Sequence, residues 1–230
     1  MARIGSVRSA CILAGIAGIA GVLMIIDSFG INNGPPLSSP DRVFMAYAVS
    51  HRTPVLVGAW LQAVGPALII ALALTLVALS RAAERPSGLL TIFGAGVLMT
   101  TSLMEIACYI AQLFTSPPEL PRIANSFGYA IQHLYFFVAA PALFLPLGWV
   151  LLQSALLPRL FGWLALLIGV VFLALGVATI NELVLPAPVT AFAAVQALWW
   201  LGAGITLIVR SNRVAQMNFD QLQQPVQSRL

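Results

Sequence analysis

Six long apolar runs, separated by short polar segments, dominate this sequence. At about 1.5 Å of rise per residue, each run is long enough to cross the roughly 30 Å hydrocarbon core of a bilayer as a helix. Only 8% of the 230 residues are charged and 60% are hydrophobic, whereas soluble domains contain about 25% charged residues. The sequence therefore predicts an all-α fold, an integral membrane bundle of six transmembrane helices.

Proline-containing and polar turns set the expected ends of the helices. The predicted spans are 9–28, 54–80, 88–114, 123–150, 158–182 and 189–209, within a single domain over residues 1–212. The first run follows Arg3 and Arg8 like a signal peptide, but its length favours an uncleaved first helix. Pro141 and Pro146 are expected to kink the fourth span. Residues 213–230 are polar and rich in glutamine, and we expect a disordered tail.

The long loop between the first two spans contains a second helical signal. Ser39-Pro40-Asp41 has the order of an N-cap residue, a first-turn proline and a first-turn acid. We expect a short interfacial helix from Pro40 to about His51 on the external side.

The arginines are distributed unevenly between the two ends of the predicted bundle. Six spans put both termini on one side of the membrane. All eleven basic residues are arginines, of which three fall on the far side (Arg42, Arg52 and Arg122) and eight on the side of the termini (Arg3, Arg8, Arg81, Arg85, Arg159, Arg210, Arg213 and Arg229). Because cytoplasmic segments carry the excess of basic residues, this bias places both termini in the cytoplasm.

Glu105 lies near the middle of the third span, where a charge costs roughly 2.5–3.5 kcal/mol on insertion scales. The short turn after this span makes the third and fourth helices antiparallel neighbours, so residues whose numbers sum to about 238 should lie at equal depth. This rule places Glu105 level with His133. It also matches Tyr109 with Tyr129, and Gln112 with Asn125 or Ser126.

Polar residues also recur on one face of each of these two helices. Glu105, Tyr109 and Gln112 follow one helical stripe, and a second contains Asn125, Tyr129, Gln132 and His133. Two polar stripes at one depth should face each other and not lipid. Gln62, Glu182 and Gln196 add polar groups from the second, fifth and sixth spans. Together these residues predict a polar pocket open to the periplasmic side.

Three interpretations of the pocket remain open. It could bind or pass a small ligand or a proton from the periplasm, since intramembrane ionisable residues are enriched at such sites. It could belong to a membrane-embedded enzyme with Glu105 and His133 as acid and base, although no nucleophile or catalytic signature accompanies them. Its residues could also only tie helices together in a structural subunit.

Composition excludes several other functions and partners. The absence of lysine excludes Schiff-base chemistry. The two cysteines and two histidines have no metal-ligand spacing, so neither a metal nor a cofactor is expected. Arginines at helix ends suit anionic lipid headgroups and not nucleic acid. Besides the lipid bilayer, a second copy or another membrane protein could contact the small-residue face formed by Ala14, Gly15, Gly18 and Gly21.

One short run carries a family resemblance. The run Leu157-Pro158-Arg159-Leu160-Phe161-Gly162-Trp163-Leu164-Ala165-Leu166 resembles the start of the penultimate helix in a broad family of uncharacterised bacterial multi-pass membrane proteins, which carry a Leu-Pro-Arg-x-x-Gly-Trp run. The resemblance implies a protein of the bacterial inner membrane and carries over no activity.

Overall fold

The structure is a computed structural model that describes residues 2–179, 181 and 187–223. The helices of these residues are α1 (Ala2–Ile31), α2 (Asp41–Ser50), α3 (Arg52–Leu79), α4 (Pro86–Ala111), α5 (Leu120–Leu134), the π-helix η1 (Tyr135–Ala139), α6 (Ala140–Leu152), α7 (Arg159–Ala178), α8 (Ala187–Val209) and α9 (Ser211–Gln223). Six helical segments are long and apolar enough to cross a membrane. This confirms the predicted all-α bundle with six spans.

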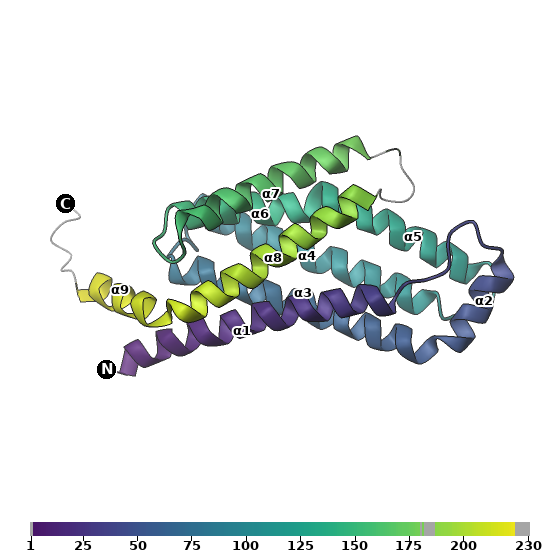
Figure 1. The fold of residues 1–230 in the computed structure, drawn as a ribbon, viewed down its shortest axis with the longest axis horizontal. Coiled ribbons are helices and arrows are strands. Elements are labelled where there is room, and N and C mark those ends of the chain that lie inside the picture. Colours follow the sequence, from purple (N-terminus) through teal and green to yellow (C-terminus); the bar gives the residue numbers. More distant parts are fainter. Residues whose placement is uncertain (1, 180, 182–186, 224–230) are drawn as a thin grey trace.

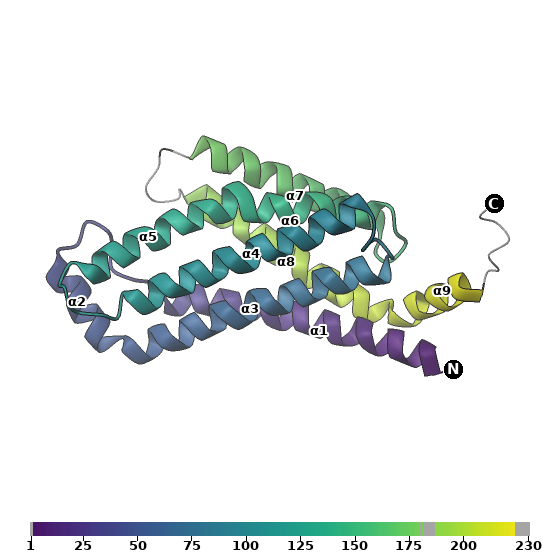
Figure 2. The same cartoon turned by 180° about the vertical axis from the view of Figure 1, so that it is seen from behind.

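The spans form one elongated bundle (Figures 1 and 2). α3 packs against both α1 and α4, and α4 continues the layer to α5 and α6. α7 packs on α6, while α8 crosses the bundle to reach α1. The start of α1 and the short α9 lie at one end, which we call the termini end. α2 lies at the opposite end, which we call the α2 end.

The bundle is apolar both inside and on its outer surface. Leu72, Phe144, Leu147 and Trp200 are almost completely buried in one continuous core. Large apolar side chains also cover the outside, as a surface in contact with lipid tails requires. Since lipid is as apolar as leucine, close packing and hydrogen bonds hold such helices together.

The small-residue face of α1 packs inside the bundle. A Cβ atom added at Gly21 would lie 2.5 Å from the carbonyl oxygen of Gly65 on α3, and one added at Gly15 would lie 2.7 Å from that of Gly204 on α8. Gly18 packs in the same way against Leu72 of α3. These glycines bring the helix backbones close together. The expected contact of this face with a second protein is therefore wrong, because α3 and α8 already cover it.

The fourth span contains a π-helical segment where a proline kink was expected. Pro141 has no N–H to donate to the carbonyl of Phe137 one turn earlier. The chain responds by widening one turn, in which the N–H of Ala140 donates to the carbonyl of Tyr135. Gly176 of α7 sits against this wider turn, where an added Cβ atom would lie 2.8 Å from the Cα atom of Phe137.

Two predictions outside the spans need correction. Residues 213–223 lie in helix α9 instead of a disordered tail, because Val214, Ala215 and Met217 among the polar residues pack into the core beside α1. Residues 224–230 lie outside the described residues. The short helix after the first span is present as α2, but its N-cap is Pro40, without the expected serine cap.

Candidate functional site

Glu105 is the centre of a buried polar cluster between three helices. Its side chain is 6% exposed. Gln62 Nε2 of α3 donates to Oε2 at 2.7 Å, and Tyr109 OH of α4 donates to Oε1 at 2.9 Å. Gln132 Nε2 of α5 donates to Oε1 at 3.1 Å. Among the residues that the structure describes, this carboxyl group has only uncharged hydrogen-bond partners.

Helix geometry explains how these donors reach one point. Tyr109 lies one turn after Glu105 on α4, so the two side chains share a face. Gln62 lies one turn before Pro66 inside α3. Because Pro66 has no N–H, the backbone carbonyl of Gln62 loses its usual helical partner, and α3 is weakest at the level of the cluster.

The predicted depth was correct, but the predicted partner was wrong. α4 and α5 are antiparallel neighbours, and Glu105 meets residue 132 where residue 133 was expected. One residue along a helix turns the side chain by about 100°. Gln132 therefore faces Glu105, while His133 makes no hydrogen bond to the described residues and its Nε2 is buried without a partner.

A second polar contact adjoins the cluster across the bundle. Tyr135, the first residue of the π segment, donates its hydroxyl proton to Gln196 Oε1 of α8. Gln196 is thus placed inside the bundle as predicted, although its partner is Tyr135. Tyr135 itself was missed, although it lies three residues after Gln132, the same spacing that joins Tyr129 to Gln132.

The α2 end of the bundle is covered. Asn125 Nδ2 donates to the carbonyl of Pro35 at 3.4 Å, and a Cβ atom added at Gly34 would lie 3.6 Å from Gln112 Oε1. Residues 32–40 form the loop between α1 and α2. Gln112 and Asn125 are both buried beneath this loop.

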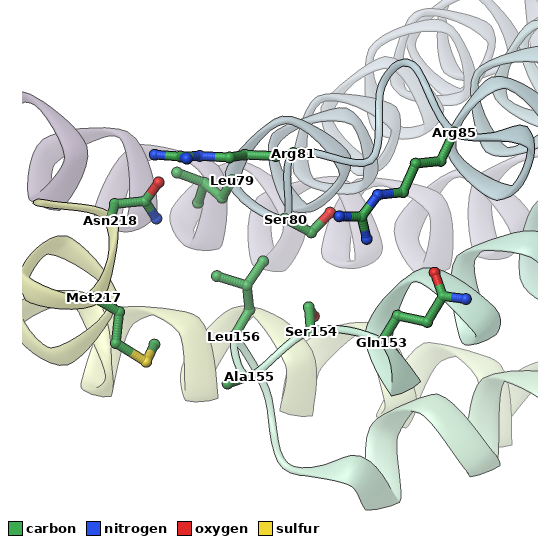
Figure 3. A pocket seen from close by; sticks show the side chains of 10 residues that line it. All are labelled: Leu79, Ser80, Arg81, Arg85, Gln153, Ser154, Ala155, Leu156, Met217 and Asn218. Atoms are coloured by element: carbon green, nitrogen blue, oxygen red, sulfur yellow. The ribbon is translucent and has the colours of Figure 1, made fainter. Parts of the chain in front are cut away.

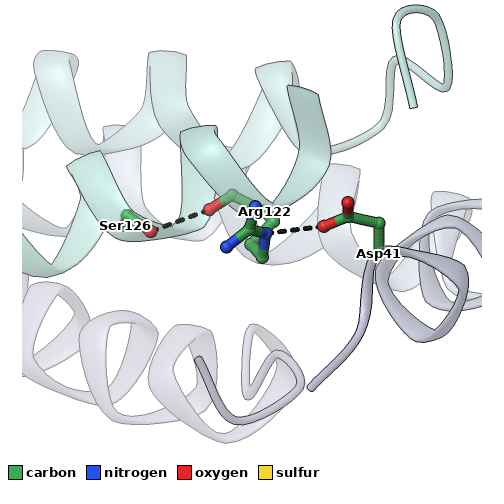
Figure 4. Close-up of polar contacts among 3 residues, drawn as sticks. All are labelled: Asp41, Arg122 and Ser126. Atoms are coloured by element: carbon green, nitrogen blue, oxygen red, sulfur yellow. Dashed lines mark hydrogen bonds and ion pairs between the residues drawn. The ribbon is translucent and has the colours of Figure 1, made fainter. Parts of the chain in front are cut away.

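An ion pair fixes the start of α2 to α5. Arg122 Nε donates to Asp41 Oδ1, and Ser126 Oγ donates to the carbonyl of Arg122 one turn before it (Figure 4). The loop and α2 therefore lie over the polar residues. Among the described residues, this cover lies over Gln112 and Asn125, and the expected opening of a pocket to this side stays a prediction.

Several buried polar atoms near this end have no hydrogen-bond partner. They are Asn32 Oδ1, Gln62 Oε1, Gln112 Nε2 and His133 Nε2. Leaving such an atom unpaired costs about 1–3 kcal/mol, so each calls for an explanation. Asn32 and its partner Ser28, which donates to the carbonyl of Gly58 at 2.9 Å, were not predicted. Their i, i+4 spacing at the end of the first span was the available signal.

The remaining predicted residues contribute less. Tyr129 is half-buried and hydrogen-bonds to no described side chain. Glu182 lies outside the described residues. No group of three or more metal-ligating side chains occurs within the described part of the chain.

The cluster can hold Glu105 in either protonation state. As a carboxylate, it accepts all three hydrogen bonds. As a carboxylic acid, it must donate one proton to an acceptor. Rotation of the Gln62 amide by half a turn would present Oε1, which has no other partner, to the protonated Oε2.

Comparison of the chain with protein-family models, with curated proteins and with solved structures found no match. The resemblance carried by residues 157–166 therefore stays a prediction. The structure does explain the run physically. Pro158 precedes the first residue of α7, and a Cβ atom added at Gly162 would lie 3.0 Å from the carbonyl oxygen of Gly148 on α6.

Proposed function

We propose that this chain is a multi-pass membrane protein that reversibly binds a proton at Glu105. The observation that carries the proposal is the set of uncharged donors around a buried carboxyl group. An arginine or histidine beside Glu105 would hold it permanently ionised. With neutral partners, gain of a proton removes a charge from a medium where charge is expensive.

A proton suits this site better than a larger ligand does. Glu105, Gln62 and Tyr109 are all buried, and the loop around Pro35 closes the α2 end. A proton needs no open cavity, because it can travel along hydrogen-bonding groups and transient water. The unpartnered Gln112 Nε2 provides such a group between Glu105 and the α2 end, and the unpartnered His133 Nε2 provides one at the level of Glu105. For the enzyme alternative, the described hydrogen-bond partners of Glu105 include no serine, threonine or cysteine that could act as a nucleophile.

The direction of uptake follows from the arginine bias. Eight of eleven basic residues fall on the side of the termini, which favours a cytoplasmic location for that side. The α2 end would then face the periplasm of a bacterium, and the protein would lie in the inner membrane, as the resemblance of residues 157–166 also implies. Protons would enter from the outer side.

Infrared difference spectroscopy during a pH titration tests this proposal directly. The protein is reconstituted in bilayers and titrated between about pH 4 and pH 9. A carbonyl band of a protonated, buried carboxyl group should change in the parent protein and be absent from Glu105→Gln. Glu84→Gln, which removes an exposed acid of the 80–85 turn, is the matched control and should keep the band.

Two results would contradict the proposal. One is a parent spectrum in which no band of a protonated carboxyl group changes over this range. The other is a band change of the same size in the parent protein and in Glu105→Gln. In either case the cluster only ties α3, α4 and α5 together.

A further inference from the structure

A cavity of about 480 Å³ lies at the termini end, far from Glu105 (Figure 3). The end of α3, the turn before α4, the α6–α7 loop and α9 all contribute to its wall. Polar and basic side chains dominate the lining, including Ser80, Arg81, Arg85, Gln153, Ser154 and Asn218. None of the described residues that line it is acidic.

Two arginine charges at this cavity are not neutralised. Neither Arg81 nor Arg85 forms an ion pair within the described residues, where Arg122–Asp41 is the ion pair found. Glu84 lies between them in the sequence but does not line the cavity. In Figure 3 the guanidinium group of Arg85 points toward Ser80 and Gln153, and that of Arg81 extends toward Asn218. The cavity therefore has a positive wall on one side.

Arg81 also occupies a backbone position that favours glycine. Its φ angle is 53°, in the left-handed region. The N–H of Ala82 donates to the carbonyl of Val77, and the N–H of Arg81 donates to that of Ala78. This is the Schellman pattern that ends many helices, and its left-handed residue is usually glycine. An arginine retained in this conformation indicates a use for its side chain.

A smaller cavity of about 350 Å³ adjoins the first and shares the 153–155 segment with it. Arg159 and Arg210 line this second cavity, and Arg210 donates to the carbonyl of Ala155 at 3.3 Å. Trp149 and Trp163, both exposed on the outer surface, lie close in sequence to the α6–α7 loop. Tryptophan favours the membrane–water interface. The cavities thus lie at the level expected for lipid phosphate groups.

We infer that the cavity between Arg81, Arg85 and Gln153 binds a phosphate group, carried by a lipid or by a soluble phosphate compound. Arginine forms paired hydrogen bonds to phosphate oxygens. The side-chain amide of Gln153 makes no hydrogen bond to the described residues and adds a free donor. Ser80 and Ser154 already donate their hydroxyl protons to the carbonyls of Val77 and Leu151. The two guanidinium groups and the amide are therefore the donors for the anion.

Binding measurements on the full-length protein test this inference in two arms. The first titrates inorganic phosphate onto the protein in bilayer discs of neutral phosphatidylcholine. The second compares discs with and without phosphatidylglycerol, with retained lipid measured by native mass spectrometry. In at least one arm, the variant Arg81→Gln/Arg85→Gln should bind about tenfold more weakly. Loss in the first arm identifies a soluble phosphate compound, and loss in the second alone identifies a lipid headgroup.

Two further variants separate a site from general surface charge. Arg213→Gln removes an exposed arginine of α9 that does not line the cavity and should leave binding unchanged. Arg81→Gly should melt at a higher temperature, because the left-handed strain is gone, yet bind more weakly. This variant keeps the test valid even if the double variant folds poorly.

The inference is overturned if phosphate binding is unchanged in both arms for Arg81→Gln/Arg85→Gln and for Arg81→Gly. It is also overturned if Arg213→Gln weakens binding as much as the cavity variants do. Either result would mean that Arg81 and Arg85 serve only to orient the protein in the membrane.

Discussion

The Glu105 cluster and the basic cavity solve the problem of charge in a membrane protein in opposite ways. Glu105 is buried inside the bundle and surrounded by neutral donors from three helices. Arg81 and Arg85 line a cavity at the bundle end and have no ion-pair partner among the described residues. Water and headgroups can solvate the arginines, whereas only the protein itself can solvate Glu105. Stability should therefore depend on the first region, and anion binding on the second.

Glu105→Leu should produce the largest loss of stability. The change leaves Gln62, Tyr109 and Gln132 without their acceptor, and we expect a loss of about 3 kcal/mol. Thermal unfolding in detergent micelles measures it. Glu105→Gln is the control and should lose less, because its amide oxygen still accepts. Equal stability of Glu105→Leu and the parent protein would contradict the idea that the Glu105 cluster stabilises the bundle.

Gly88→Ala should have the next largest effect and should act on the second region. A Cβ atom at this position would lie 1.9 Å from the carbonyl oxygen of Ala82. The turn that carries Arg81 and Arg85 must therefore move, at a cost of about 2 kcal/mol. Unfolding and phosphate titration should change together. Gly96→Ala is the matched control, since nothing lies within 4 Å of an added Cβ atom there.

Tyr109→Phe should cost about 1 kcal/mol, because it removes one neutral hydrogen bond to Glu105 at 2.9 Å. A double-mutant cycle with Glu105→Gln, read by thermal unfolding, isolates this bond. The coupling should be clearly above zero. An additive cycle would mean that Tyr109 stabilises the bundle only by its apolar contacts with Val55, Ala59 and Leu113.

Arg81→Gly should give the smallest effect, of opposite sign. Relief of the left-handed strain should exceed the extra backbone entropy of glycine and stabilise the fold by about 0.5 kcal/mol. Unfolding in detergent detects it. Arg85→Gly, where the backbone has an ordinary extended φ of −89°, is the control and should not be stabilised. A loss of stability in Arg81→Gly would show that the arginine side chain contributes to the fold itself.

The sequence was most informative about properties that depend only on position along the chain, such as the ends of the helices and the depth of a residue. The second and third spans, predicted at 54–80 and 88–114, are observed at Arg52–Leu79 and Pro86–Ala111. Length and hydropathy decide these ends without any knowledge of neighbours. Counting residues from a shared turn also placed Glu105 level with residues 132 and 133. Depth along an antiparallel pair depends only on a constant rise per residue.

Sequence reasoning failed where rotation and packing decide the outcome. The choice between Gln132 and His133 depends on a turn of about 100° around one helix axis. The burial of Gln112 and Asn125 depends on the path of the loop between α1 and α2. The proline and glycine residues of this loop allow many paths and do not specify one. The helix α9 forms because Val214 and Met217 pack into the core beside α1. The polar average composition of residues 213–230 does not reveal these two apolar residues.

The sequence by itself determined that this chain forms six apolar helices, that the carboxyl group of Glu105 lies well inside the third of them, and that arginines concentrate at the side of the termini. These are properties of single residues in their order, and the bilayer acts on each span separately. Only the tertiary structure decided that Gln62, Tyr109 and Gln132 surround Glu105. It also decided that Arg81 and Arg85 line a common cavity. Both arrangements arise when close packing fixes the rotation of each helix and the path of each loop relative to all the others.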